Sequence, residues 1–231
     1  MTAVSCPTVI ERPRDLPTSM QQLASRAQYR KGDTIYYQDG PAEYGYQIVT
    51  GAARECALQP DGRRQVVGFL MPGDMFGFCT PQVHRFSGET IAETTTIARY
   101  PRHRVERLAE SDPEVARHLL QLANDAVERL QNRMTVLTRP TALERVSSFI
   151  LYMTDGVAGN ANNSVVLPMS RYDIADYLAL SVETVSRTLT ELRQRRVVEL
   201  FSARCGSIID RALLQRYSEN GEPRSHASQW D

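Results

Sequence analysis

The hydrophobic period of the chain changes near residue 111, and this change restricts the possible folds more than any other feature. From Asp33 to Tyr100, short runs of β-branched and aromatic residues are separated by glycine-bearing turns, a pattern typical of antiparallel β-structure. From Ser111 to Leu137, apolar residues recur every three or four positions, as they do along one side of a helix. These patterns predict an α+β fold, in which an antiparallel β-barrel of jelly-roll type precedes one long helix.

The long helix carries its own start signal and an apolar stripe. Ser111 is followed by Pro113 and then by Glu114, which indicates a capping box at the start of the helix. The stripe either packs against the barrel of the same chain or forms the seam of a homodimer. Its length favours the dimer, with some contact to the barrel. The predicted dimerisation residues are Leu119, Ala123, Ala126, Leu130 and Leu137.

After the long helix, the chain has the pattern of a winged helix-turn-helix domain. Thr-Arg-Pro at 138–140 breaks the helix. Two short helical segments then start at Ser170 and Ser181, separated by a tight turn, which is the arrangement that places a second helix in the DNA major groove. Alternation around Gly206 predicts a two-stranded wing. The predicted parts are an N-terminal arm (1–27), the barrel (28–110), the dimerisation helix (111–137), the DNA-binding domain (138–217) and a flexible tail (218–231).

Composition argues against several classes of protein. No apolar run approaches the ~18 residues of a membrane span, and the N-terminus lacks a secretory signal, so we expect a cytoplasmic protein. The 27 basic and 27 acidic residues cancel, so DNA binding must rest on local pattern and not on net charge. The four cysteines match no zinc spacing and are expected to be reduced, and the four histidines form no cluster. We predict no metal site.

Three polar residues, Glu183, Ser186 and Arg187, stand at the start of the second short helix and allow three interpretations. On an ordinary solvated face, Glu183 and Arg187 would form an i, i+4 pair that contributes a few tenths of a kcal/mol. A catalytic cluster would need a base, an orienting group and a pocket, which this pattern lacks, so we predict no enzymatic activity. As base-reading residues, the arginine would bridge guanine O6 and N7, and the carboxylate would accept from cytosine or adenine.

With these parts assembled, the chain resembles the superfamily of bacterial transcription factors formed by the cyclic-AMP receptor protein and the fumarate–nitrate regulator (CRP/FNR). The resemblance covers about residues 30–217. Residues 46–78, with their glycine turns, are similar to the family's cyclic-nucleotide-binding-like effector barrel, and residues 173–200 are similar to its winged helix-turn-helix. The motif Glu-x-x-Ser-Arg at 183–187 is that of the fumarate–nitrate regulator branch. Within that branch the chain most resembles the FixK-type regulators of rhizobia.

The resemblance implies a homodimeric transcription activator that recognises a palindrome with TTG at one end and CAA at the other. Glu183, Ser186 and Arg187 would read the bases. RNA polymerase would be recruited through loops at 155–164 and 79–86, and the target genes would serve microoxic or anaerobic respiration or nitrogen fixation. Phosphate contacts are expected from Ser170, Ser181, Thr184 and Arg195.

The barrel departs from the nucleotide-binding branch of the superfamily in its phosphate cassette. Phe78 stands where that branch has a glutamate for the ribose, and Phe86 stands where it has an arginine for the cyclic phosphate. A buried phosphate without a cation costs several kcal/mol, so we expect no cyclic nucleotide. Only Cys6 precedes the barrel, which does not match an iron–sulfur site, and we predict no cofactor. Two alternatives stay open: a regulator gated by an unrecognised small molecule or by haem, and a scaffold that does not bind DNA.

Overall fold

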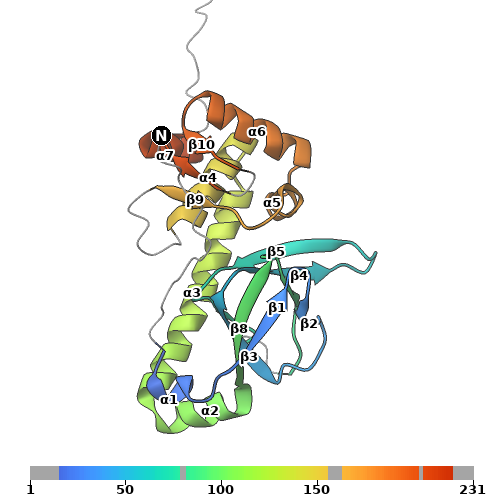
Figure 1. The fold of residues 1–231 in the computed structure, drawn as a ribbon, viewed down its shortest axis with the longest axis vertical. Coiled ribbons are helices and arrows are strands. Elements are labelled where there is room, and N and C mark those ends of the chain that lie inside the picture. Colours follow the sequence, from blue (N-terminus) through green and yellow to red (C-terminus); the bar gives the residue numbers. More distant parts are fainter. Residues whose placement is uncertain (1–15, 79–81, 156–162, 203–204, 221–231) are drawn as a thin grey trace, which may run out of the picture. The chain divides into compact units, whose positions relative to one another are not determined.

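The structure is a computed structural model, and it describes residues 16–78, 82–155, 163–202 and 205–220. The chain forms two compact units that divide between Asn132 and Arg133, inside one long helix (Figure 1). The five-part division expected from the sequence is finer than this and stays a prediction.

The first unit holds two antiparallel sheets and the helices that pack on them. The sheets have the strand orders β1-β8-β3-β6 and β2-β7-β4-β5. The predicted class of fold is confirmed, except that the described strands do not close into a barrel. Closure needs continuous pairing around the ring, and strand β6 offers only two residues at the edge of its sheet. The elements of this unit are α1 (Thr18–Gln21), β1 (Ser25–Arg30), β2 (Thr34–Tyr36), β3 (Tyr44–Thr50), β4 (Ala53–Leu58), β5 (Arg64–Leu70), β6 (Met75–Phe76), β7 (Ser87–Thr90), β8 (Thr94–Pro101), α2 (Arg102–Ser111) and the first part of α3 (Pro113–Leu137).

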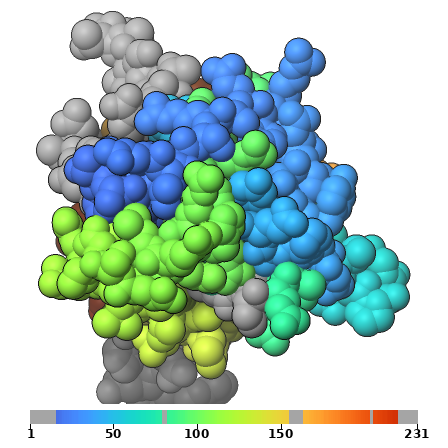
Figure 2. All heavy atoms as spheres, turned by 90° about the horizontal axis from the view of Figure 1, so that it is seen from below, coloured from blue at the N-terminus to red at the C-terminus, as the bar shows by residue number. Residues whose placement is uncertain are grey.

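Two clusters of buried side chains hold the first unit together. One lies between the sheets and includes Tyr36, Tyr46, Ile48, Phe76 and Ile97. The other lies where the helices meet the first sheet, and Figure 2 shows the residues after Thr18 (blue) against the surface of α2 and α3 (green). Each fully buried aliphatic or aromatic side chain in such a cluster contributes roughly 1.5–3 kcal/mol. The members of the second cluster are Leu16, Met20, Met75, Ala98, Tyr100, Val105, Val115 and Leu122.

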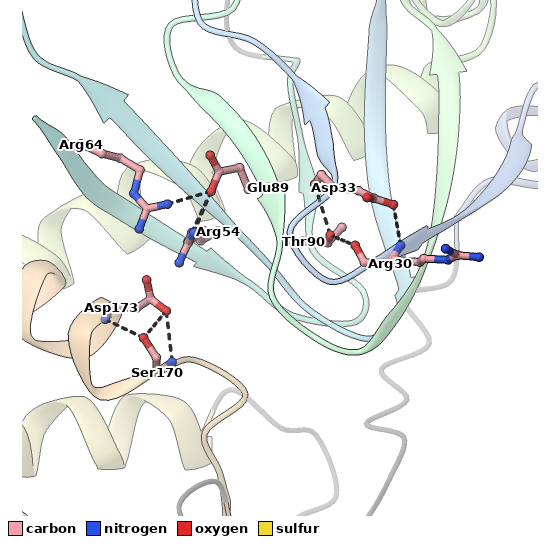
Figure 3. A network of polar contacts seen from close by, with 8 residues as sticks. All are labelled: Arg30, Asp33, Arg54, Arg64, Glu89, Thr90, Ser170 and Asp173. Carbon is pink, nitrogen blue, oxygen red and sulfur yellow. Dashed lines mark hydrogen bonds and ion pairs between the residues drawn. The ribbon is translucent and has the colours of Figure 1, made fainter. Parts of the chain in front are cut away.

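A polar network crosses the outer face of the second sheet. One carboxylate oxygen of Glu89 on β7 accepts hydrogen bonds from Arg54 Nη2 on β4 at 2.8 Å and from Arg64 Nη1 on β5 at 3.0 Å (Figure 3). Strand β4 pairs with both neighbours in the antiparallel sense. Opposite charges on three adjacent strands add to the pairing of the sheet.

The start of α3 differs from the sequence prediction. Ser111 is the last residue of α2, and it does not cap α3. Asp112 takes that role, because its Oδ1 accepts a hydrogen bond from the amide of Glu114 at 3.0 Å, while its Oδ2 accepts one from the hydroxyl of Ser19 at 2.8 Å. Both serine and aspartate favour caps, so the pattern alone did not separate them. The helix α2 that fixes the choice was absent from the prediction.

The second unit contains a helix-turn-helix and a small sheet. Its sheet has three strands in the order β10-β11-β9, so the predicted two-stranded wing gains a strand from residues before the helix-turn-helix. Helix α4 packs against α7 and α6, and the core holds Phe149, Ile174, Leu178, Leu192 and Leu214. The elements are the last part of α3, α4 (Ala142–Asp155), β9 (Ser164–Val166), α5 (Arg171–Leu178), α6 (Val182–Gln194), β10 (Val198–Leu200), β11 (Cys205–Ile208) and α7 (Arg211–Asn220).

The cysteines follow the prediction only in part. Cys56 is a buried free thiol. Cys205 is disulfide-bonded, so the expectation of reduced cysteines is wrong at this position. Within the described part of the chain, no group of three or more potential ligand residues could hold a metal ion. No helix among those residues is long and apolar enough to cross a membrane.

Candidate nucleic-acid interface

Helix α5 begins with a complete capping box. The hydroxyl of Ser170 accepts a hydrogen bond from the amide of Asp173 at 3.1 Å, and the Asp173 carboxylate accepts from the Ser170 amide at 3.1 Å (Figure 3). The same hydroxyl also donates to Asp173 Oδ2 at 2.7 Å. This confirms the start of α5 predicted from sequence. The Ser170 hydroxyl proton is therefore already used in the bond to Asp173, although Ser170 itself is exposed.

Helix α6 begins at Ser181, as the sequence predicts. The Ser181 hydroxyl accepts a hydrogen bond from the amide of Thr184 at 3.1 Å and lies 2.9 Å from the Thr184 hydroxyl. Ser181 is exposed and Thr184 is half-buried. Unpaired amides and the helix dipole make this end of α6 favourable for an anion. Ser181 and Thr184 are therefore brought together at a helix start.

One side of α6 is buried and the other is free. Every third or fourth residue, Val185, Thr188, Leu189 and Leu192, is buried in the second unit. The opposite positions, Glu183, Ser186, Arg187 and Thr190, are exposed. The 3.6-residue period of the helix explains this separation. The structure thus places the three predicted base-reading residues together on the open side of α6, within its first two turns.

The Glu183–Arg187 ion pair considered from the sequence does not form. Among the residues that the structure describes, neither side chain takes part in a hydrogen bond or an ion pair. Arginine presents five donors and glutamate two acceptor oxygens, so both groups keep their full capacity for an external partner. The i, i+4 pair is therefore absent from the described structure, and the base-reading role of the two residues stays a prediction.

Arg195, the fourth residue predicted to contact phosphate, lies apart from the others. It follows the last turn of α6, ~20 Å from Ser181 at 1.5 Å of rise per residue. Its guanidinium forms an ion pair with Glu191 at 2.7 Å, donates to the Tyr217 hydroxyl at 3.1 Å and lies 5.5 Å from the Tyr217 ring centre. The structure therefore does not bring Arg195 to the start of α6, and it gives the side chain partners within α6 and α7.

A pocket of about 390 Å³ lies between α6, the wing and the start of α5. It contains two guanidinium groups and three hydroxyl groups and no carboxylate. Burial lowers the pKa of Arg171, and its Nη1 has no hydrogen-bond partner among the residues that the structure describes. A buried cationic donor without a partner is a costly arrangement, which an incoming anion would relieve. The lining residues are Arg171, Ser186, Leu189, Thr190, Arg193, Leu200 and Ser202.

Arg171 and Arg193 were not among the predicted contact residues, although the sequence contains a signal for both. Arg193 continues the exposed row of α6 because it follows Ser186 and Thr190 at helical spacing. Arg171 is the first residue after the N-cap Ser170. The wing residue Ser202 lies beside these two arginines because the chain bends back. No local sequence pattern predicts that bend.

The interior of the first unit is filled with aromatic rings. The ring of Tyr36 stacks on His84 with 3.9 Å between centres and on Tyr46 with 5.2 Å, and Tyr46 stacks on Phe76 with 5.5 Å. Such stacked pairs are favourable when rings are offset. Burial raises the pKa of Tyr46 to about 12 and lowers the pKa of His84. Both groups are therefore neutral near pH 7.

The two phenylalanines of the altered cassette are both partly buried. Phe78 packs against the helix-side cluster. A Cβ atom at Gly45 would meet the Phe78 ring at 2.0 Å, so glycine is required for this close approach. Arg85, the nearest cation to the Phe86 position, is exposed. The space next to Gly45 is thus occupied by a ring of the chain itself.

The fold and the exposed residues Glu183, Ser186, Arg187 and Thr190 of α6 together define a class of protein. This class is the winged helix-turn-helix DNA-binding regulators with an N-terminal sensory-type β-domain. Two family models match: the Crp-like helix-turn-helix domain over residues 144–217 and the cyclic nucleotide-binding domain over residues 26–112. The chain belongs to the CRP/FNR family of transcription regulators. It is not an enzyme.

The relatives of this chain include FixK proteins. It is 41% identical to the nitrogen fixation regulation protein FixK of Azorhizobium caulinodans, over 84% of this chain and 79% of the relative. It is 40% identical to FixK of Rhizobium meliloti, over 86% of this chain and 90% of the relative. Among solved structures, FixK2 from Bradyrhizobium japonicum matches with a TM-score of 0.78 and 40% identity, covering 84% of this chain and 96% of that one.

Proposed function

We propose that the chain is a homodimeric transcription activator that reads a TTG…CAA palindrome with Glu183, Ser186 and Arg187. The observation that carries this proposal is the exposed row on α6, in which Glu183 and Arg187 have no partner in the described structure. A guanidinium and a carboxylate one turn apart suit a guanine and the neighbouring base of the opposite strand. The names of the FixK relatives support a role in nitrogen fixation, and the role in microoxic or anaerobic respiration rests on the family resemblance.

DNA phosphates complete the proposed interface. Ser181 and Thr184 offer hydroxyls at the positive end of α6. Ser170 stays in the proposal as a weaker contact, because its hydroxyl would first have to release Asp173 Oδ2. The pocket with Arg171 and Arg193 would accept a further phosphate next to the wing. Arg195 stays in the proposal as a weaker contact, since it would first have to leave Tyr217.

The proposed dimer uses the exposed side of α3. Leu119 packs against the core of the first unit, and Ala126 is half-buried, while Ala123 and Leu130 remain exposed. The large exposed apolar residues of this helix are Leu120, Val127, Leu130 and Met134, with exposed fractions of 53–68%. With Ala123 they alternate at spacings of three and four, which is the pattern of a two-stranded seam. The proposed seam therefore keeps Ala123, Leu130 and the half-buried Leu137, replaces Leu119 and Ala126 with Leu120 and Val127, and adds Met134.

Activation would require a contact with RNA polymerase. Parts of the two loops assigned to it from sequence, residues 79–81 and 156–162, lie outside the described residues. We also propose that the protein acts in the cytoplasm, where its DNA target lies. These parts of the proposal rest on the family relationship.

Gating by a small molecule or haem is the competing proposal. The rings of Tyr36, Tyr46, Phe76 and His84 occupy the interior between the sheets, which leaves less room for a ligand. A native mass spectrum would reveal a ligand that copurifies with the protein, and only its presence would favour gating.

The deciding experiment is a gel shift of the full chain with a TTG…CAA duplex and a scrambled duplex at the same salt concentration. We expect a preference of at least 10³-fold for the palindrome, in the range of specific DNA-binding proteins. Equal binding to both duplexes would contradict base reading. Absence of binding to either would favour a scaffold that does not bind DNA.

A further inference from the structure

The turn between α5 and α6 has an unusual residue at its tightest point. The amide of Leu180 donates to the Ala175 carbonyl at 2.9 Å, and the amide of Ala179 donates to the Asp176 carbonyl at 3.3 Å. These are the two bonds of a Schellman motif, which normally has glycine at the left-handed position. Here that position is Ala179, with φ 53° and ψ 49°. A side chain makes this conformation strained, so the turn depends on support from outside.

Arg145 on α4 supplies that support. Its Nη1 donates to the carbonyl oxygens of Leu178 at 3.3 Å and Ala179 at 3.5 Å. Carbonyls at the end of a helix lack partners within the helix and form the negative end of its dipole, so a guanidinium suits them. The Nε of the same side chain donates to the Arg139 carbonyl at 2.8 Å. One guanidinium therefore joins the turn to residues 138–141, the hinge segment between α3 and α4.

Two further arginines, Arg133 and Arg139, contact the helices around residues 138–141. The guanidinium of Arg133, at the end of α3, lies 4.9 Å from the centre of the Tyr177 ring in the last turn of α5. Arg139 Nη1 donates to the Glu219 carbonyl in α7 at 3.4 Å. The hinge segment is thus tied on one side to α7 and, through Arg145, to the turn of the helix-turn-helix.

We infer that Arg145 is a positioning residue for DNA recognition, which fixes the angle at which α6 leaves α5 and makes that angle depend on the hinge segment. This inference rests on the proposed function, because α6 must read DNA for its angle to matter. Arg145 acts through Leu178 and Ala179 and does not itself read a base. A change in the hinge segment would move the Arg139 carbonyl, and the shared guanidinium would pass that movement to the turn.

The test compares three variants of the full chain. Arg145→Ala removes the bridge, and Arg145→Lys keeps the charge but cannot reach the hinge and the turn with one planar group. Arg216→Ala is the control, because it removes an exposed arginine from the same unit. Two readouts are needed: amide hydrogen exchange at Ala179 and Leu180 in the free protein, and affinity for the TTG…CAA and scrambled duplexes. Thermal melting identifies any variant that does not fold.

We expect both Arg145 variants to exchange faster than wild type at Ala179 and Leu180. We expect them to lose at least tenfold in affinity for the palindrome, with a loss on scrambled DNA equal to that of Arg216→Ala. If Arg145→Ala does not fold, Arg145→Lys decides alone. Wild-type exchange at the turn, or a loss no larger than that of Arg216→Ala, would overturn the inference. A wild-type chain without preference for the palindrome would instead refute the proposed function, and the exchange measurement would still decide whether Arg145 supports the turn.

Discussion

The hydroxyl of Ser181 accepts a hydrogen bond from the amide of Thr184 at 3.1 Å, and this bond caps the helix that carries the candidate base-reading residues. The hydroxyl is neutral, and it sits where the dipole of α6 favours an anion. A residue that satisfies the helix equally well but carries a negative charge would therefore separate the two roles of this position.

Ser181→Asp should keep the cap and lower DNA binding. Aspartate caps helices as well as serine does, so the melting temperature should change little. Its carboxylate would face a DNA phosphate, and two like charges ~4 Å apart cost on the order of 1 kcal/mol even in water. Thermal melting and duplex binding are measured together. Ser181→Asn, which caps without charge, is the matched control, and normal DNA binding by Ser181→Asp would show that this position does not face the DNA.

Arg187→Ala should weaken specific binding by about 1–3 kcal/mol per half-site and blur discrimination at the guanine of the site. Arg171→Ala should instead weaken binding to all sequences alike and reduce its salt dependence, because its proposed partner is a phosphate. Titrations with the palindrome, with guanine-substituted duplexes and with scrambled DNA at several salt concentrations distinguish the two. A uniform loss for Arg187→Ala would remove it from base reading.

Leu130→Glu should dissociate the dimer and weaken DNA binding with it. Leu130 is 60% exposed in the single chain, and a charge buried in the seam without a partner is strongly unfavourable. Light scattering gives the oligomeric state. Asn124→Glu places the same charge at an exposed polar position of α3 and should leave the dimer intact. A Leu130→Glu protein that stays dimeric would exclude this side of α3 from the interface.

Cyclic AMP should neither bind the first unit nor alter DNA binding. Phe78 and Phe86 replace the polar groups that the nucleotide-binding branch uses, and the Phe78 ring fills the space beside Gly45. Calorimetric titration with cyclic AMP up to the millimolar range is the measurement. A saturating heat signal would show that the rings move aside and that another cation binds the phosphate.

Glu55→Gln should stabilise the first unit at neutral and alkaline pH. The Tyr36 hydroxyl donates to Glu55 Oε1 at 2.7 Å, and a glutamine oxygen can accept the same bond. Although part of the residue is exposed, protein surrounds the carboxyl group, and burial raises the pKa of Glu55 above its usual 4.5. The folded state then binds more protons than the unfolded state, so the stability contributed by neutral Glu55 is present below pH 4.5 and declines as the pH rises through the folded-state pKa.

The gain in melting temperature of Glu55→Gln over wild type should therefore be small near pH 4 and grow toward pH 8. Thermal melts across this range are the measurement. A gain that does not vary with pH would mean that the carboxyl titrates alike in the folded and unfolded chain.

The sequence predicted those parts of the interface that depend on local physics. Ser170 and Ser181 were recognised as caps because a short hydroxyl before an amphipathic segment can satisfy free amides without any help from the rest of the fold. The exposure of Glu183, Ser186 and Arg187 followed from the same period that buries Val185 and Leu189. The resemblance to the family then gave these exposed positions a role.

Tertiary structure decided what local pattern leaves degenerate. Ser111 and Asp112 are equally good caps, and only the end of α2 selects Asp112. Leu119 and Leu120 are equally apolar neighbours, and only the buried cluster between the helices and the first sheet separates them, since Leu119 packs against it and Leu120 stays exposed.

Contacts between residues far apart in the sequence were not predictable in the same way. Arg171 and Ser202 line one pocket, and Arg145 reaches Ala179, because the chain turns back on itself between them. The sequence by itself determined the starts of α5 and α6 and the exposed row of α6, since these depend on neighbours within a few residues. The two sheets, the side of α3 that faces solvent and the arginine that holds the turn were decided by tertiary structure, since a long-range contact forms only when the whole fold places both partners within reach.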